Sequence, residues 1–211
     1  GMCEHAPNGL NGNRPAGNLT VTAVDAFLAG THPEPEAKIY GAALLKLHRI
    51  GKIDPSSLKD YLAHDGYVGL RRAMGYTPEQ IIQIMETSGI LGRGGAMFPL
   101  GLKWKFTRAA PGSPADKHII ANADESEPGT FKDRALLEGD PYSLIEAMTL
   151  AAYVVGAENG WIFVRGEYPR AYERLCHAVR RAQDEGYLGR NLLSRQGFHF
   201  DIEVRRGAGA Y

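Results

Sequence analysis

The chain has 211 residues, 44% of them hydrophobic and 23% charged, which are ordinary values for a protein with one globular core. Its 24 basic and 24 acidic residues leave a formal net charge of zero and are interspersed, so the sequence argues against a nucleic-acid-binding protein. No apolar stretch is long enough to span a bilayer, and we expect no direct membrane insertion.

The N-terminus shows neither the charged nor the apolar region of a secretory signal, and Gly1 before Met2 is typical of a tag remnant. Cys3 and Cys176 are too few to hold an iron–sulfur cluster with four thiolates. We expect both to stay reduced in a cytoplasmic protein. The seven histidines show no metal-ligand spacing, so we expect no metal site.

The first 90 residues divide into a tail and a helical region. Residues 1–18 are rich in Gly, Asn and Pro without periodicity, and predict a disordered tail. Residues 19–90 predict a helical region. Its expected short helices cover residues 22–30, 37–49, 56–63 and 66–74. In the first of these helices we expect three apolar side chains to face inward, namely Val24, Phe27 and Leu28.

A further helix is predicted over residues 77–88. Thr77 suits the N-cap, Gln80 completes a capping box with it, and Gly89 suits the C-terminal stop. The expected buried side consists of Ile81, Ile82, Ile84 and Met85. This helix leads directly into a glycine-rich segment, so we expect helix packing rather than a preceding strand to position that segment.

Strand and helix patterns alternate in the second half of the chain. Residues 118–123 predict a buried strand, residues 161–165 a second strand, and the period of two over residues 198–204 a third, half-covered strand. Helices are expected between them, over residues 140–156 and 169–185. This order predicts an α/β fold with parallel pairing, in which ligands bind beyond the carboxyl ends of the strands.

Residues 92–104 form a glycine-dense segment that reads G-R-G-G-A-M-F-P-L-G-L-K-W. Arg93 and Lys103 are cations that suit a phosphate. Three glycines allow close approach of the backbone to a ligand: Gly92, Gly94 and Gly95. By itself such a segment is typical of a turn, and it is not a dinucleotide fingerprint because no strand clearly precedes it.

Residues 122–130 form an acidic segment, N-A-D-E-S-E-P-G-T, directly after the first predicted strand. Carboxylates and an amide accept hydrogen bonds from the hydroxyls of a sugar or ribityl chain. An acidic loop alone is usually only solvated. Together, the glycine-dense and acidic segments on one short α/β unit predict a nucleotide-like ligand.

Both segments resemble the NADH-binding flavoprotein subunit of respiratory complex I and the related flavin subunits of NAD-reducing hydrogenases and NAD-dependent formate dehydrogenases. Three further motifs are similar: K-D-R at 132–134, F-V-R-G-E-Y at 163–168, and G-A-G-A-Y at 207–211. The resemblance covers residues 57–211. It implies that the α/β part is a partial, Rossmann-like parallel-sheet domain over residues 91–211 that binds FMN and NADH.

The resemblance also implies roles for individual residues. The FMN-binding positions would be Gly92, Arg93, Gly94, Gly95, Lys103, Asn122, Asp124 and Glu125. The NADH-binding positions would be Phe98, Phe106, Glu127 and Tyr211. No side chain is implied as a catalytic acid or base, because the isoalloxazine ring carries the redox chemistry. Without the resemblance, the two phenylalanines are explained equally well as core residues and Lys103 as a surface charge.

The implied reaction is hydride transfer from NADH to FMN, followed by release of single electrons to iron–sulfur centres. The resembling proteins continue beyond the position of Tyr211 with further flavin contacts and a 4Fe–4S cluster domain, so we expect this length alone to be a truncated, inactive fragment. The implied partner is an electron-transfer subunit carrying iron–sulfur clusters, on the cytoplasmic face of a membrane. Two alternatives remain: a cofactor-free structural module, and a flavin subunit of a hydrogenase or formate dehydrogenase.

Three positions depart from the pattern of the resembling proteins. Leu91 stands in place of the usual Arg, Met97 in place of Gly and Leu100 in place of Thr. If position 97 requires a positive φ, a Met there costs about 1 kcal/mol or more. If that position requires only close approach of the ligand, Met97 crowds the nucleotide instead.

Overall fold

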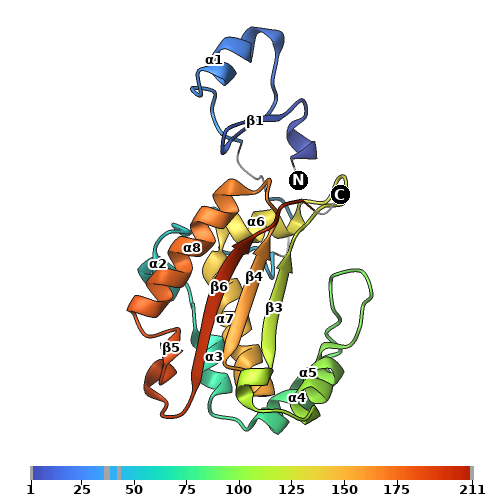
Figure 1. Ribbon diagram of the computed structural model, residues 1–211, viewed down its shortest axis with the longest axis vertical. Helices are drawn as coiled ribbons and strands as arrows, with labels where there is room; N and C mark the ends of the chain where they lie inside the picture. Colours follow the sequence, from blue (N-terminus) through green and yellow to red (C-terminus); the bar gives the residue numbers. More distant parts are fainter. Residues whose placement is uncertain (1, 36–38, 42–43, 210–211) are drawn as a thin grey trace.

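The computed structural model describes residues 2–35, 39–41 and 44–209. Its centre is a four-stranded sheet with the order β3-β4-β6-β5. Three strands are parallel, as predicted: β3 (His118–Ala123), β4 (Asn159–Val164) and β6 (His199–Arg206). The short β5 (Gly189–Arg190) pairs antiparallel with β6. Figure 1 shows the main helices on one side of the sheet: α6 (Lys132–Gly139), α7 (Pro141–Val155) and α8 (Pro169–Asp184).

The core lies between the sheet and these helices. Ile162 of β4 and Leu175 of α8 are fully buried. A Cβ added at Gly160 would lie 2.6 Å from the ring of the buried Phe200, so any larger residue on β4 would have to displace this ring. Helix α7 begins at Pro141 and ends at Val155, where the capping Gly156 adopts a left-handed φ of 77°. Among the described helices, none is long and apolar enough to cross a bilayer.

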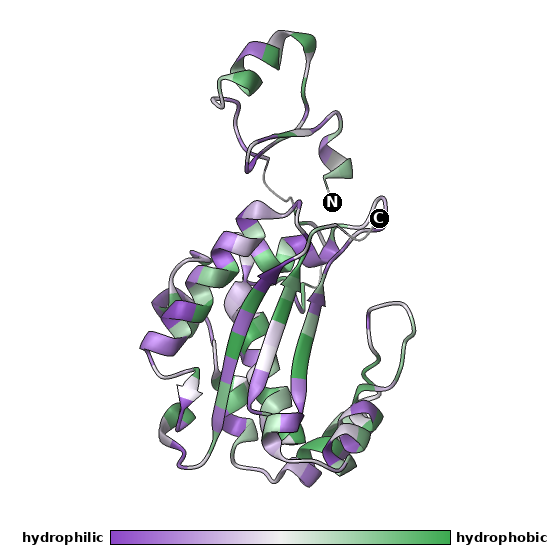
Figure 2. Ribbon diagram, in the orientation of Figure 1, coloured by the Kyte–Doolittle hydropathy of each residue, from purple (hydrophilic) through white to green (hydrophobic). Residues whose placement is uncertain are grey.

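The face of the sheet opposite the helices is open. Strand β3 forms where predicted, but its predicted burial is wrong because it lies at the edge of the sheet, and Ile120 is 67% exposed. Phe163 of β4 is also exposed on this face. Figure 2 shows hydrophobic and hydrophilic residues interspersed along these strands. Periodicity could not reveal this exposure, because it depends on whether another element covers the strand.

Helix α4 (Pro78–Ser88) confirms the predicted punctuation, with the complete capping box and a left-handed Gly89. Ile81 and Ile82 are buried as predicted. The predicted burial of Ile84 is wrong, since this side chain is 51% exposed. The reason is the position of the neighbours: α5 (Leu100–Ala109) and α7 pack against the other sides of α4. Among the residues that join the sheet and these helices, short 3-10 turns form at Pro114–Asp116 and Leu192–Ser194.

The predicted short helices near residues 56–74 are confirmed as α2 (Leu58–Ala63) and α3 (Val68–Ala73). The helix predicted over residues 37–49 falls partly on residues 36–38 and 42–43, which lie outside the described chain. Over residues 44–49 the helix prediction is wrong, because residues 45–49 form turns and residue 44 is not helical.

The division into tail, helical region and binding domain stays a prediction, although the expected tail contains regular structure. A hairpin joins β1 (Gly9–Asn11) to β2 (Arg14–Ala16), after a 3-10 turn at Cys3–His5. A second 3-10 turn, Val21–Ala23, leads into α1 (Val24–Leu28). The predicted inward orientation of Val24 and Leu28 is wrong, with 46% and 69% of each side chain exposed, because the small hairpin covers only the neighbourhood of Phe27.

Candidate functional site

The glycine-dense segment forms a loop between α4 and α5. Its base closes like a hairpin: the Gly92 N–H donates to the Phe98 oxygen at 2.9 Å, and the Leu100 N–H donates to the Ile90 oxygen at 2.9 Å. The tip is open, with no atom within 4 Å of a Cβ built at Gly94 or Gly95. The loop is therefore positioned by two packed helices, as predicted, and its tip reaches the level of the carboxyl end of β3 in Figure 1.

Arg93 and Lys103 lie exposed on this loop and at the start of α5. Within the described part of the chain neither cation pairs with a carboxylate, whereas Lys105 on α5 pairs with Glu86 at 3.2 Å. Unpaired cations beside exposed backbone N–H groups suit an anion such as a phosphate.

Two aromatic rings accompany these cations. Phe98 is 43% exposed and Phe106 is 60% exposed. The interpretation of these residues as core is therefore wrong, and the rings remain available for stacking on a planar ligand.

Met97 adopts a left-handed backbone with a φ of 51°, so this position needs the conformation that favours glycine. Its side chain is largely exposed. A non-glycine residue in this region costs about 1–2 kcal/mol.

We expect Met97→Gly to raise the free energy of unfolding by about 0.5 kcal/mol. Relief of the steric strain is offset in part by the greater entropy of glycine in the unfolded chain. Urea denaturation measures the change, and Met97→Ala is the control because it shortens the side chain but retains the strain. An equal gain in both variants would attribute the effect to the thioether side chain instead.

The acidic segment leaves the carboxyl end of β3 and folds back on itself. The Asp124 N–H donates to Asn122 Oδ1 at 3.1 Å, and the Ser126 hydroxyl donates to Asp124 Oδ1 at 3.1 Å. Asn122 is exposed and Asp124 half-buried, so both keep oxygen atoms or amide protons within reach of solvent. Glu127 lies exposed further along the loop, and the predicted site residue Tyr211 lies outside the described residues.

Glu125 differs from its neighbours because it is buried. Its carboxylate accepts hydrogen bonds from the backbone N–H groups of Asp133 and Arg134, at the start of α6. The Tyr168 hydroxyl donates to the same carboxylate at 3.1 Å. Burial raises the pKa of Tyr168, and the charge of Glu125 adds to the shift, so the hydroxyl stays protonated and acts as a donor.

Arg165 connects the end of β4 to this loop. It donates to the main-chain oxygen of Glu125 at 2.7 Å and to the carboxylate of Glu167 at 3.1 Å. Arg165 and Tyr168 both lie in the F-V-R-G-E-Y motif, yet nothing in that motif predicts their individual roles. Their contacts to Glu125 span about 40 residues of sequence and become visible only after folding.

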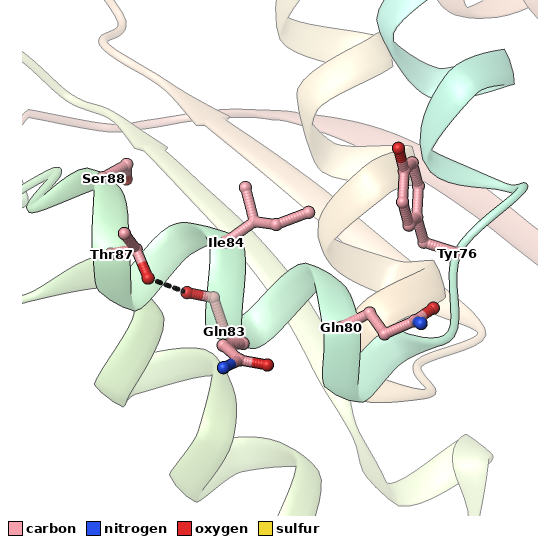
Figure 3. Close-up of a pocket in the computed structure, with 6 residues that line it drawn as sticks. All are labelled: Tyr76, Gln80, Gln83, Ile84, Thr87 and Ser88. Atoms are coloured by element: carbon pink, nitrogen blue, oxygen red, sulfur yellow. Dashed lines mark hydrogen bonds between the residues drawn. The ribbon is translucent and has the colours of Figure 1, made fainter.

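Two hollows lie near these elements. The larger, of about 510 Å³, runs along the outer face of α4 and is shown in Figure 3, with Tyr76, Gln80, Gln83, Ile84, Thr87 and Ser88 as its lining. It contains none of the predicted site residues. The second, of about 380 Å³, lies under β3 and includes Asn122 and Asp133 among mostly apolar neighbours. Within the described residues, no group of three or more His, Cys, Asp or Glu residues is arranged to hold a metal.

Residues 85–211 match a family described as the Nuo51 FMN-binding domain. An NADH-quinone oxidoreductase subunit of Aquifex aeolicus is 46% identical over 176 residues, which cover 82% of this chain and 40% of the relative. The NADP-reducing hydrogenase subunit HndC of Solidesulfovibrio fructosivorans is 47% identical over 162 residues, or 76% of this chain and 32% of the relative. The chain thus spans 40% or less of the length of these two relatives.

A solved structure is similar as well. The crystal structure of NAD⁺-reducing NiFe-hydrogenase in the air-oxidized state superposes with a TM-score of 0.71 and 28% sequence identity. The match covers 100% of this chain and 35% of the hydrogenase chain. The similarity therefore extends over all the elements described above.

Proposed function

The chain belongs to the Nuo51 FMN-binding domain family, and we propose that it is the flavin- and nucleotide-binding portion of an NADH-oxidising flavoprotein subunit. The observation that carries this proposal is the open loop between α4 and α5, where Arg93 and Lys103, unpaired within the described residues, accompany exposed Phe98 and Phe106. A loop with free cations, open backbone and exposed rings matches a phosphorylated, planar ligand better than it matches a purely structural turn.

The side chains and backbone groups of the two loops have the chemistry that FMN would need. Arg93, Lys103 and the backbone of Gly92, Gly94 and Gly95 would hold the phosphate side. Asn122 and Asp124 would accept hydrogen bonds from the ribityl hydroxyls. When bound, FMN supplies the capacity to take a hydride and to release electrons singly. This chain contributes binding and orientation, and no side chain needs to move a proton.

NADH would approach from the open side of the loop. Phe98 and Phe106 would stack on its adenine part, and Glu127 would contact the same nucleotide. Met97 lies directly before Phe98 and would narrow this entrance, because its flexible thioether packs readily against an aromatic ring. The electrons would leave through a 4Fe–4S cluster and then through a partner subunit that carries iron–sulfur clusters.

The redox partner has two candidates. A quinone-reducing complex is one, and the identity with the relative from Aquifex aeolicus supports it. A hydrogenase is the other, supported by the identity with HndC and by the hydrogenase structure. Both would place the chain in a multisubunit assembly, with the same flavin chemistry and different electron acceptors.

Flavin titration tests the proposal. We expect the chain to bind FMN in the micromolar range, because it spans 40% or less of the length of the two relatives above. Lys103→Ala should raise the Kd for FMN about tenfold, the effect of losing about 1.4 kcal/mol from a charge-assisted contact. Lys105→Ala is the matched control, since it removes an equal charge that is already paired with Glu86.

Riboflavin separates a phosphate contact from a general loss of folding. Lys103→Ala should leave riboflavin binding within about twofold of the wild type, because riboflavin lacks the phosphate that the lysine would meet. Equal effects of the two lysine variants on FMN, or the absence of any saturable FMN binding, would contradict the proposed function.

A further inference from the structure

Glu125 lies between the two residues proposed to face the flavin and Glu127, yet its side chain points into the protein. We infer that Glu125 is a positioning residue and not a ligand contact, and that Glu125, Arg165 and Tyr168 form a brace that holds the acidic loop in place. The inference rests on the proposed function for its effect on flavin binding. The brace itself rests only on the contacts described below.

The carboxylate of Glu125 is already fully engaged. Its side chain is 1% exposed. Oε1 accepts from the N–H of Asp133 at 2.9 Å, and Oε2 accepts from the N–H of Arg134 at 3.2 Å. Both donors are orphan N–H groups at the start of an α-helix, where a negative charge is also stabilised by the helix dipole. Turning this carboxylate toward a ligand would leave buried donors unpaired.

Tyr168 adds a side-chain hydrogen bond to Glu125, and Lys132 Nζ lies 3.7 Å from Oε1 of the same carboxylate. This tyrosine precedes α8 and is 3% exposed, and its hydroxyl donates to Oε2 of Glu125 at 3.1 Å. The bond joins the loop after β3 to the start of the helix after β4. The buried carboxylate is thus held by the first turn of α6 and by the residue that precedes α8, which leaves the loop little freedom to shift.

Arg165 is hydrogen-bonded to the main chain of the same loop. Its guanidinium donates to the main-chain oxygen of Glu125 at 2.7 Å and lies 5.7 Å from the centre of the Tyr168 ring. The Arg165 N–H also donates to the Ala123 oxygen at 3.2 Å, which continues the pairing of β4 with β3. Both the side chain and the backbone of Glu125 are therefore fixed by the F-V-R-G-E-Y segment.

The brace determines where the flavin-facing residues lie. Asp124 directly precedes Glu125, and the Asp124 N–H is bonded to the side chain of Asn122. A shift of Glu125 would carry these two residues with it. Loosening the brace should weaken flavin binding although none of its three side chains touches the ligand.

The test compares two tyrosine variants that each remove one buried hydroxyl. Tyr168→Phe loses the bond to Glu125, and Tyr142→Phe loses a bond to the Ser56 oxygen at 3.1 Å. We expect both to lower the urea midpoint by similar amounts. Only Tyr168→Phe should raise the Kd for FMN, by about fivefold, while Tyr142→Phe should stay within twofold of the wild type.

Hydrogen exchange tests the brace without any ligand. Tyr168→Phe and Glu125→Gln should accelerate exchange at the amides of Asp133 and Arg134 at least tenfold relative to Tyr142→Phe, as followed by NMR. If the wild type binds no FMN, the proposed function fails, whereas faster exchange would still support the brace. Unchanged exchange in both variants would overturn it. Weaker FMN binding by Glu125→Gln with unchanged exchange would show instead that Glu125 contacts the ligand directly.

Discussion

Glu146→Ala should lower the free energy of unfolding by about 4 kcal/mol. Glu146 lies on α7 and accepts three hydrogen bonds from the segment that carries α2 and α3: the Tyr61 hydroxyl at 2.5 Å, the Tyr67 N–H at 2.7 Å and the Leu70 N–H at 3.0 Å. Hydrogen bonds to a charged group contribute about 1.5 kcal/mol or more each. The alanine variant also leaves buried donors without a partner, since Tyr61 and Tyr67 are at most 1% exposed.

Urea denaturation followed by circular dichroism measures this loss. Glu146→Gln should cost less, about 2 kcal/mol, because the amide oxygen still accepts from one or two of the donors. Asp184→Ala removes an exposed carboxylate from α8 and should change the free energy of unfolding by less than about 0.5 kcal/mol. A loss in Glu146→Ala as small as that of Asp184→Ala would show that water replaces the carboxylate at the start of α3.

The second large effect is expected for Arg49→Ala, at about 3 kcal/mol near neutral pH. Arg49 pairs with Asp140, whose side chain is 1% exposed, at 3.4 Å, and Asp140 Oδ1 has no hydrogen-bond partner among the described residues. Removing the cation leaves a buried, uncompensated carboxylate, which typically costs about 3–5 kcal/mol. The variant also loses the bond from Arg49 to the His64 oxygen and the contact with the Tyr61 ring.

The pH dependence of this loss follows from Asp140. Burial raises the pKa of Asp140 above its usual value, and Arg49 opposes that shift. A raised pKa means that the favourable contribution of this group is present in acid, below the pKa of the unfolded chain, and is lost as pH rises through the pKa of the folded chain. Without Arg49 the pKa of Asp140 rises further, so the variant should be more strongly destabilised near neutral pH than in acid.

Asp140→Asn in the Arg49→Ala background provides the control, because it should flatten the pH dependence of the difference from wild type. Arg72→Ala, which removes an exposed cation on α3, should change the free energy of unfolding by less than about 0.5 kcal/mol at any pH. A pH-independent loss in Arg49→Ala would indicate that the packing of Arg49 on Tyr61 dominates over its pairing with Asp140.

The sequence predicted the ends of helices and strands well where they depend only on interactions between neighbouring residues. The capping box of Thr77 and Gln80 and the left-handed Gly89 bound α4 as expected, because caps involve only neighbouring residues. The alternation over residues 198–204 predicted β6 for a similar reason. The turns over residues 45–49 were not predicted, since their apolar spacing is also compatible with a helix and the outcome depends on distant packing partners.

The candidate site shows the same division. Its two loops were predictable because glycines, cations and carboxylates have recognisable chemistry wherever they lie. The structure then separated residues that look equivalent in the sequence: Asn122 is exposed and Glu125 is buried, although only two residues lie between them. Burial of Glu125 depends on α6 and Tyr168 converging on it, and no local pattern contains that information.

The sequence by itself determined the parallel α/β order, the caps of α4 and the family resemblance of the two loops. It also predicted that a Met at position 97 is strained if that position requires a positive φ. Each of these depends on backbone conformation or on motifs within a few residues. The tertiary structure alone decided that β3 is an exposed edge strand, that Ile84 faces solvent, and that Glu125 accepts hydrogen bonds from the first turn of α6. These outcomes depend on which distant surfaces meet, and that is set by the packing of the whole chain rather than by any segment of it.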